Sequence, residues 1–257
     1  MRRAHAPAWL TDRRIAHRGL HDKVKAVIEN TLRAAQAAIA GGFSIECDIQ
    51  ISKDGKAFVF HDETLERLTG APGPFNERTA VEIAKLRISG ADEPAAFAAF
   101  LDLVAGRTPI VCELKSHFDG DFRLASRAAT LAATYGGPLA FESFDHDLMA
   151  YMRLIRPRMR SGTPCPLGIV AEASYDDASF AALTLEQKRD WTDFDVFDRN
   201  PPDFLSWNVD DLPHKIPFLM KEFHGAPVLA WTVRTPHQRE AARKWADQIV
   251  FEGYGLA

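Results

Sequence analysis

The stretch SIECDIQISKDGKAFVFHDETLERLTG, residues 44–70, decides the fold. SIECDIQI reads as a strand, SKDGK carries an Asp-Gly turn, and AFVFH at 57–61 reads as the returning strand of a hairpin. Residues two apart in a strand project from the same face, so Glu46 and Asp48 form a carboxylate pair with roughly 6–7 Å between their Cα atoms. Two buried negative charges are unfavourable, so this pair predicts a compensating cation.

Outward from this hairpin, short apolar runs alternate with helical patterns. The strands are expected at 14–17, 44–51, 109–115, 138–144, 167–172, 204–208, 227–233 and 248–253. The helices are expected at 30–42, 79–86, 121–135, 145–155, 178–192, 214–223 and 236–246. About eight strands separated by helices predict an α/β fold, the (β/α)8 TIM barrel, with the hairpin and a small insertion at 62–106 after the second barrel strand. An open doubly wound sheet is the alternative, but the first strand is followed by AHRGLHD rather than a Gly-rich phosphate loop.

The composition is that of a globular protein with a small negative net charge. The chain has 257 residues, of which 46% are hydrophobic and 26% charged, and we expect residues 1–257 to form a single barrel domain. There are 31 Lys and Arg against 35 Asp and Glu, a net charge of -4, with no long basic run. Nucleic acid is therefore not an expected partner.

Compartment and redox state follow from what the chain lacks. It has neither an apolar segment long enough for a secretory signal nor a window that approaches a membrane span, so a cytoplasmic protein without stable membrane insertion is expected. The three cysteines, Cys47, Cys112 and Cys165, are odd in number, widely spaced and set in apolar runs. They are expected to be buried free thiols rather than a disulfide framework or a zinc site.

A second strand repeats the charged pattern of the first. In CELK, Glu113 and Lys115 share one face of a strand that is otherwise apolar. Glu46, Asp48 and Glu113 would together form a hard oxygen site of the kind that Mg²⁺ or Ca²⁺ prefers. The alternative is that these carboxylates form structural ion pairs with Arg or Lys on neighbouring strands.

Two histidines are expected beside this site. His17 and Arg18 end the first strand, at the end where barrel enzymes carry their chemistry, and the hairpin returns His61 towards the level of Asp48. Two imidazoles beside a metal suit acid/base cleavage of a phosphate ester, in which one takes a proton from the attacking oxygen and the other protonates the leaving alkoxide. Arg18 and Lys115 would offset the charge on the phosphate oxygens.

These residues lie in motifs that resemble the glycerophosphodiester phosphodiesterases. The matching blocks are IAHRGLHD, IENTLRAAQAAIAGGFSIECDIQISKDGKAFVFHDETLERLTG and CELKS, in the order and spacing of that family. The resemblance implies a barrel, a divalent cation, and hydrolysis of small soluble glycerophosphodiesters to sn-glycerol 3-phosphate and an alcohol. It implies His17 and His61 as general base and acid, Arg18 and Lys115 as phosphate contacts, and Glu46, Asp48 and Glu113 as metal ligands. Attack by water and attack by the substrate's own glycerol 2-hydroxyl both remain open.

Several positions are ambiguous or depart from that family. Asn30 is expected to cap the following helix, or else to turn its amide to the site. Trp231 would contact the glycerol or fill the barrel, and Arg234, where the family often has Asn, would bind an anionic headgroup or form a surface ion pair. The stretch DEPAAFAAF keeps only the proline of a common family element, and VFEGYGLA replaces a common Thr-Asp-x-Pro. Oligomeric state is left between a monomer and a small homo-oligomer.

Other functions are compatible with parts of this pattern. A lysophospholipase D or a sugar-phosphate diesterase would use the same site on another substrate. A catalytically inactive barrel acting as a binding protein would be expected to lack His17, His61, Glu46, Asp48 or Glu113, and all five are present. A barrel isomerase or aldolase using an imine would need a lysine of lowered pKa, which Lys115 among so many carboxylates is not expected to have.

Overall fold

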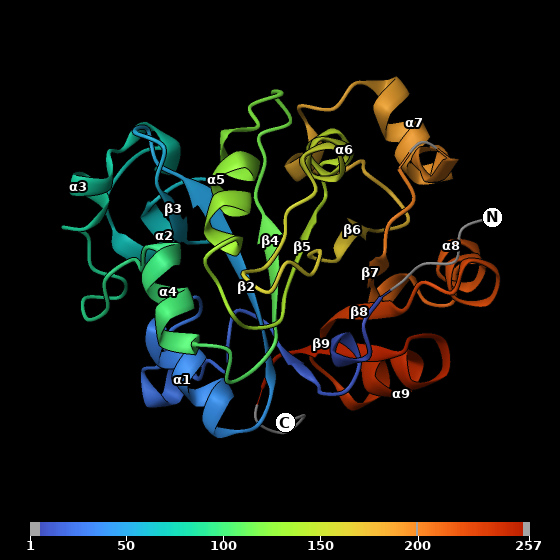
Figure 1. The fold of residues 1–257 in the computed structure, drawn as a ribbon, viewed down its shortest axis with the longest axis horizontal. Helices are drawn as coiled ribbons and strands as arrows, with labels where there is room; N and C mark the ends of the chain where they lie inside the picture. Colours follow the sequence, from blue (N-terminus) through green and yellow to red (C-terminus); the bar gives the residue numbers. More distant parts are fainter. Residues whose placement is uncertain (1–5, 199, 254–257) are drawn as a thin grey trace.

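The strands close into a parallel barrel. The computed structural model describes residues 6–198 and 200–253, and within them eight parallel strands form one ring with the helices outside it (Figure 1). The ring consists of β1 (Ile15–Ala16), β2 (Ser44–Ile51), β4 (Ile110–Leu114), β5 (Leu139–Ser143), β6 (Leu167–Ala171), β7 (Phe204–Asn208), β8 (Val228–Val233) and β9 (Gln248–Phe251). A further strand, β3 (Ala57–Val59), pairs antiparallel with the end of β2.

Closure depends on the short first strand, which pairs on both sides. Ile15 is in register with Ser44 of β2 and with Val250 of β9. The first and last strands, far apart in the sequence, therefore lie together in the ring (Figure 1). The predicted TIM barrel with its hairpin is confirmed, and the open doubly wound sheet is wrong because no strand of the ring has a free edge.

The helices follow the strands in the expected order. The larger ones are α1 (Leu32–Ala40), α4 (Phe97–Val104), α5 (Arg123–Ala132), α6 (His146–Ile155), α7 (Leu185–Asp193), α8 (Lys215–Leu219) and α9 (Pro236–Trp245). Alpha-helix α8 continues directly into the π-helical turn η7 (Met220–His224). Short 3-10 turns are η1 (Ala8–Leu10), η2 (Lys23–Lys25), η4 (Ala178–Phe180), η5 (Asp195–Asp198) and η6 (Val209–Asp211). Thr184 and Thr235 begin α7 and α9 with capping boxes, which satisfy backbone N–H groups at the helix start.

The segment 62–106 contains two kinds of packing. Its first part forms α2 (Glu66–Thr69), η3 (Phe75–Glu77) and α3 (Ala80–Ile83). These short elements pack with the hairpin around a separate cluster that includes Phe60, Phe75 and Ile83. Alpha-helix α4, which the sequence analysis did not anticipate, instead packs Phe97 and Phe100 into the main core with the barrel helices.

Polar residues line the barrel interior on β2, although all eight residues of that strand are buried. Ile45, Cys47 and Ile49 belong to the main core between the strands and the helices. Ser44, Glu46, Asp48 and Gln50 occupy the alternate positions, which face the inside of the ring. The strand therefore buries both faces, but only its outward face needs apolar side chains.

A small apolar cluster fills the other end of the ring. It includes Ile15, Val111, Phe204 and Val250, with Leu10 of η1 closing the bottom. A Cβ at Gly168 would lie 2.4 Å from the Phe204 ring, so the missing side chain provides the space that this ring occupies. This plug leaves the carboxyl ends of the strands as the open end of the barrel.

The three cysteines lie in the main apolar core. Cys47, Cys112 and Cys165 are all free and buried, as predicted. Within the described part of the chain, no helix combines the length and the apolar character needed to cross a membrane.

Candidate active site

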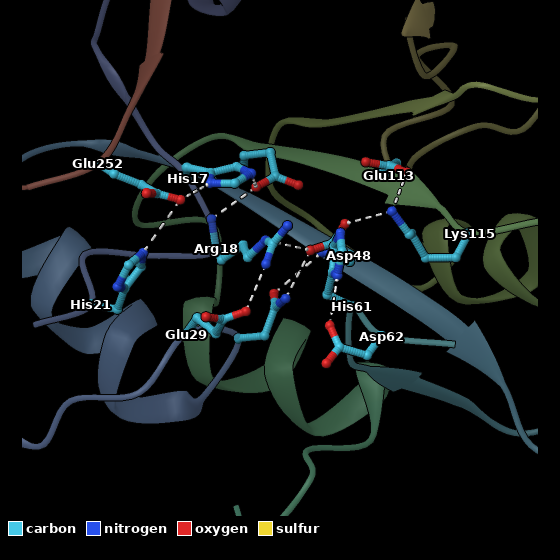
Figure 2. Close-up of polar contacts among 12 residues, drawn as sticks. His17, Arg18, His21, Glu29, Asp48, His61, Asp62, Glu113, Lys115 and Glu252 are labelled. Carbon is cyan, nitrogen blue, oxygen red and sulfur yellow. Dashed lines mark hydrogen bonds and ion pairs between the residues drawn. The ribbon is translucent and has the colours of Figure 1, made fainter. Parts of the chain in front are cut away.

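The carboxyl ends of the barrel strands bring the predicted site residues together. His17 and Arg18 follow β1, Glu46 and Asp48 lie on β2, and His61 follows β3. Glu113 lies on β4 with Lys115 just after it, Trp231 lies on β8, and Arg234 follows β8. Parallel strands place these positions at one mouth of the barrel. Figure 2 shows the polar contacts among most of them.

Three carboxylates form the centre of this site. One oxygen from each of Glu46, Asp48 and Glu113 lies within 4.8 Å of the other two. The geometry follows from strand register, because Asp48 pairs directly with Glu113 across β2 and β4. Glu46 and Asp48 are buried, while Glu113 is half-buried.

The surroundings shift the pKa values of Glu46 and Asp48 in opposite directions. Burial raises the pKa of Glu46 well above its usual value, and the neighbouring Asp48 raises it further. Burial acts in the same direction on Asp48, but His61, Lys115 and Arg18 outweigh it and hold the pKa of that carboxyl well below its usual range. The described cations therefore offset the charge of Asp48 and, through Lys115, of Glu113, while Glu46 has no described lysine or arginine side chain within ion-pair distance.

His17 is held by a carboxylate that the sequence analysis did not single out. Its Nδ1 lies 2.5 Å from Oε1 of Glu252, and its Nε2 lies 3.8 Å from Oε2 of Glu46. Glu252 directly follows β9 and also accepts hydrogen bonds from Arg234, 2.7 Å from Nε. Burial lowers the pKa of His17 to about 4, only partly opposed by Glu252, so the ring is neutral at neutral pH.

His61 is held by a second carboxylate, Asp62. Its Nδ1 lies 2.9 Å from Oδ1 of Asp62, and Arg67 donates to both oxygens of that carboxylate. Arg67 also donates to Glu29, which accepts from Arg18 at 2.6 Å. A chain of ion pairs through Arg67 thus links the loop after β3 to the loop after β1. Figure 2 shows the two ends of this chain, the His61–Asp62 pair and the Arg18–Glu29 pair.

The two predicted phosphate contacts lie against the carboxylate cluster. Arg18 Nε is 3.4 Å from Oδ2 of Asp48 and is buried without a hydrogen-bond partner. Lys115 Nζ lies 2.8 Å from Oε1 of Glu113 and 3.5 Å from Oδ1 of Asp48. Burial lowers the pKa of Lys115, but Glu113 and Asp48 raise it to a net value above normal, so this lysine is charged.

The backbone after β1 is shaped to aim these groups. Arg18 has a φ of 55°, and its N–H donates to Oε2 of Glu46 at 2.8 Å. Gly19 follows with a φ of 76°, and a Cβ there would lie 2.8 Å from Ala34 of α1. Two consecutive left-handed residues turn the chain sharply at the strand end and bring the arginine over the cluster.

The expectation that Asn30 caps the next helix is wrong. Thr31 is the capping residue of α1, and its side chain accepts from the N–H of Ala34. Asn30 turns to the site instead: its Nδ2 donates to Oδ2 of Asp48 at 2.8 Å, and its Oδ1 accepts from the N–H of Asp48 at 3.3 Å. The adjacent threonine can provide the cap, which leaves the asparagine amide to orient Asp48.

Two adjoining cavities open over these residues. The smaller, about 160 Å³, is lined by His17, Arg18, Glu46, Glu142 and Arg234, among others. The larger, about 430 Å³, extends towards Phe180 and Asp177. The two cavities share five lining side chains, those of His61, Glu113, Lys115, Phe144 and Trp231.

Trp231 therefore lies in the wall between these spaces, and Arg234 lies at the rim. Arg234 is 54% exposed and paired with Glu252, which fits the expected surface ion pair, while its place in the lining of the smaller cavity keeps a substrate contact open.

Two buried or half-buried acids at this end went unnoticed in the sequence. Glu142 on β5 faces the interior and accepts a hydrogen bond from Ser206, and burial raises its pKa to about 8. Glu252 lies in the VFEG stretch at the end of the last strand. A signal did exist, since each acid follows two residues after an inward-facing apolar residue, Ala140 and Val250. The remainder of that tail, 254–257, lies outside the described residues.

The residues present fit a hard divalent cation. Carboxylate oxygens are the donors that Mg²⁺ and Ca²⁺ prefer, and three of them converge from two rigid strands. Burial and the neighbouring Asp48 raise the pKa of Glu46 and so disfavour its charged form, which a bound cation would stabilise. Lys115 lies beside two of the three carboxylates and partly neutralises them, but it does not contact Glu46.

Sequence comparisons find relatives over a little more than a quarter of the chain. A segment of 73 residues is 45% identical to the glycerophosphodiester phosphodiesterase of Caldanaerobacter subterraneus subsp. tengcongensis, which is 28% of this chain and 29% of that protein. A segment of 74 residues is 42% identical to human glycerophosphodiester phosphodiesterase 1, covering 28% and 21% of the two chains. The chain thus matches less than a third of the length of these curated relatives.

Solved structures share the fold over nearly the whole chain. An Oleispira antarctica phosphodiesterase, solved in complex with the product sn-glycerol-3-phosphate, has a TM-score of 0.75 at 19% identity, over 95% of this chain and 93% of the other. The glycerophosphodiester phosphodiesterase of Thermotoga maritima has a TM-score of 0.68 at 24% identity, over 92% of each chain.

The wider comparison covers most of the sequence. The model of the glycerophosphoryl diester phosphodiesterase family matches residues 17–253, a span that begins at His17 and ends just after Glu252. By this match, and in agreement with the barrel and the residues at its mouth, the chain belongs to the glycerophosphoryl diester phosphodiesterase family.

Proposed function

We propose that this protein hydrolyses glycerophosphodiesters to sn-glycerol 3-phosphate and an alcohol. The observation that carries the proposal is a pair of histidines, each held through Nδ1 by its own carboxylate, at the rim of one carboxylate cluster. In the reaction a bond forms between phosphorus and the attacking oxygen, which loses a proton, and the bond between phosphorus and the alcohol oxygen breaks as that oxygen gains one. Two imidazoles supply these two proton transfers.

The two histidines are assigned by their surroundings. His17 is the general base, because its ring is neutral at neutral pH and Glu252 occupies Nδ1, which leaves Nε2 to accept a proton. His61 is the general acid, because Asp62 lies beside its Nδ1 and can offset the charge of the protonated ring. The assignment holds for attack by water and for attack by the glycerol 2-hydroxyl.

Arg18 and Lys115 are the proposed phosphate contacts. Both are cations packed against Asp48, and Arg18 Nε has no hydrogen-bond partner among the described residues. A phosphate oxygen would satisfy that buried N–H group, and a second oxygen would accept from Lys115. Such charge-assisted hydrogen bonds strengthen as charge develops on the non-bridging oxygens.

We also propose that Glu46, Asp48 and Glu113 hold a divalent cation, Mg²⁺ or Ca²⁺. A bound cation would polarise the phosphoryl group and offset the negative charge of the site. Within the chain itself, Asn30 holds Asp48 and the Arg18 N–H holds Glu46, so two of the three ligands are oriented by hydrogen bonds.

The activity is tested by release of glycerol phosphate from glycerophosphocholine, glycerophosphoethanolamine and glycerophosphoglycerol. Lysophospholipids and sugar-phosphate diesters, whose turnover stays a prediction, are assayed alongside. His17→Ala and His61→Ala are each expected to lower kcat by about 10²–10⁴-fold, the range typical for loss of a general acid or base. His237→Ala is the matched control, because His237 is exposed on α9. Turnover by wild type that survives in both histidine variants would contradict the proposal.

Cation binding is tested without an activity readout. Chelator-treated protein is titrated with Mg²⁺, Ca²⁺ or Mn²⁺ while the unfolding temperature is recorded. A ligand that binds only the folded state stabilises it, by about 2.7 kcal/mol at a hundredfold excess over Kd, so the midpoint should rise. The rise should be lost in Glu46→Gln and kept in Glu186→Gln, a change on the exposed face of α7. An equal rise in both variants would place the cation elsewhere.

Three broader expectations stay predictions. They are the single domain over 1–257, the cytoplasmic location, and a monomer or small homo-oligomer. A small-molecule substrate is supported by the Oleispira antarctica relative, whose structure contains sn-glycerol-3-phosphate.

A further inference from the structure

The larger cavity shares His61, Glu113 and Lys115 with the proposed reaction site, but its remaining walls have no role in the proposed chemistry. The smaller cavity is lined by His17, Arg18 and Glu46, groups that suit a phosphate and the hydroxyls of glycerol. The larger cavity adjoins the smaller one at His61, Glu113 and Lys115 and has a volume of about 430 Å³. Because glycerol phosphate is the constant part of the substrate, the larger cavity is the place for the alcohol part. This inference rests on the proposed function.

Aromatic rings form one wall of the larger cavity. Phe144 contacts Trp231 and Phe180, with ring centroids 5.5 Å and 5.4 Å apart, and Phe118 contacts Phe180 at 6.1 Å. Four rings from four separate segments therefore make a continuous surface beside the reaction site. The wall is built firmly, because Phe180 is buried in a cluster with Tyr175 and Trp191.

Two carboxylates, Glu172 and Asp177, also line this cavity. Glu172, half-buried after β6, accepts a hydrogen bond from Asn208 at 3.1 Å, and Asp177 accepts from the N–H of Ser179 at 2.7 Å. Neither forms an ion pair with any described residue. Lys115, the one Lys or Arg among the lining residues, is already paired with Glu113 at the phosphate end.

The charges around Glu172 reinforce this picture. Burial raises the pKa of Glu172, and Asp177 and Asp211 raise it further. The same negative surroundings that oppose ionisation of Glu172 would attract a positive ligand. The aromatic faces act in the same direction, since a cation over an aromatic ring is stabilised by the ring quadrupole.

We propose that the larger cavity binds the alcohol part of the substrate and selects a positively charged alcohol, one that bears an ammonium or quaternary ammonium group. The cationic end lies against Phe144, Phe180 and Trp231, with Glu172 and Asp177 supplying the counter-charge. A neutral alcohol forgoes both attractions, and an anionic one is repelled by the carboxylates.

The kinetic test compares two substrates that differ in the alcohol. For wild type, kcat/KM for glycerophosphocholine is expected to exceed that for glycerophosphoglycerol by about tenfold or more. A ratio of this size is expected because the cation gains contacts with the aromatic rings and the carboxylates that the neutral alcohol does not make. The double variant Glu172→Gln, Asp177→Asn should lower this ratio towards one. Asp102→Asn, an exposed change on α4, should leave it unchanged. Equal kcat/KM values in wild type, or a preference that persists in the double variant, would overturn the proposal.

A binding test separates this inference from the proposed function. Calorimetry measures choline against its uncharged isostere, 3,3-dimethylbutan-1-ol, on wild type and on the double variant. Choline is expected to bind wild type about tenfold or more tightly than the isostere, and this difference should disappear in the double variant. If no diester is hydrolysed but choline binds selectively, the proposed function fails and the cavity assignment stands. If hydrolysis occurs but choline and the isostere bind equally, the cavity assignment fails alone.

Discussion

At the scale of single residues, the site depends on two carboxylates and one amide that hold other side chains. Glu252 holds His17, Asp62 holds His61, and Asn30 holds Asp48. A carboxylate at Nδ1 sets which imidazole nitrogen carries the proton and fixes the plane of the ring. Each proposed reacting group thus has one partner that decides its orientation.

Replacing Glu252 tests this arrangement. Glu252→Gln is expected to lower kcat by about 10²-fold, because an amide cannot offset charge on the His17 ring. KM should change little, because the change acts on His17 rather than on the phosphate contacts. Steady-state kinetics on glycerophosphocholine measures both quantities.

The control for Glu252 is Glu240→Gln, which removes an exposed carboxylate from α9. It should leave kcat unchanged. A Glu252→Gln enzyme with normal kcat and raised KM would indicate that Glu252 serves the substrate through Arg234 instead.

At the scale of elements, strand β2 combines two environments in one eight-residue segment. Its outward residues join the apolar core, and its inward residues carry the carboxylates. The polar groups line the end of the barrel interior where the strands have their carboxyl ends. Apolar side chains fill the opposite end. Phe204 is the largest of those side chains, and Gly168 on the neighbouring strand makes room for it.

Gly168→Ala tests the interior plug. The added Cβ would meet the Phe204 ring at 2.4 Å, so ring or backbone must shift, and overpacking of this kind typically costs about 1–3 kcal/mol. Denaturant unfolding should report that loss of stability. In the matched control, Gly136→Ala, the nearest atom belongs to the Arg160 side chain at 3.5 Å, an ordinary contact. Equal stability of the two variants would contradict the close packing of Phe204 against β6.

At the scale of the whole molecule, ion pairs connect loops from different parts of the barrel. Glu29 follows β1, and Arg67 lies on α2 after the hairpin, yet the two are 2.7 Å apart. Burial raises the pKa of Glu29, but hydrogen bonds from Arg67 and Arg18 outweigh it and lower that pKa to about 2. The charged form of Glu29 is therefore more stable in the folded protein than in the unfolded chain.

The pH dependence of stability follows from that shift. A carboxyl whose pKa is lowered by folding stabilises the folded protein fully at pH values above its ordinary pKa, near 4.5. This contribution is lost as the pH falls towards the folded-state pKa of about 2. Glu29→Gln should therefore be less stable than wild type by about 1–2 kcal/mol at pH 7, a figure discounted for the half-exposed Arg67. At pH 3 the difference should shrink, and urea unfolding at both pH values measures it. A difference that does not change with pH would show that Glu29 acts only by packing.

The local pattern of residues was enough to predict the barrel and most of the proposed site. Strand alternation put Glu46 and Asp48 on one face, the Asp-Gly turn returned His61, and CELK supplied Glu113 and Lys115. The structure places these side chains together, because the side-chain period of a strand and the common end of parallel strands are set by local geometry. Their catalytic and metal-binding roles stay predictions. Free, buried cysteines followed in the same way from their apolar surroundings.

Only the tertiary structure decided which partners these residues have. Glu252 reaches His17 across 235 positions of the chain, and Asn30 turns to Asp48 because its neighbour Thr31 takes the helix cap. The aromatic wall joins rings from four segments, and the core helix α4 lies where composition indicated an insertion. Such contacts depend on barrel closure, which brings together side chains whose separation in the sequence contains no periodic signal.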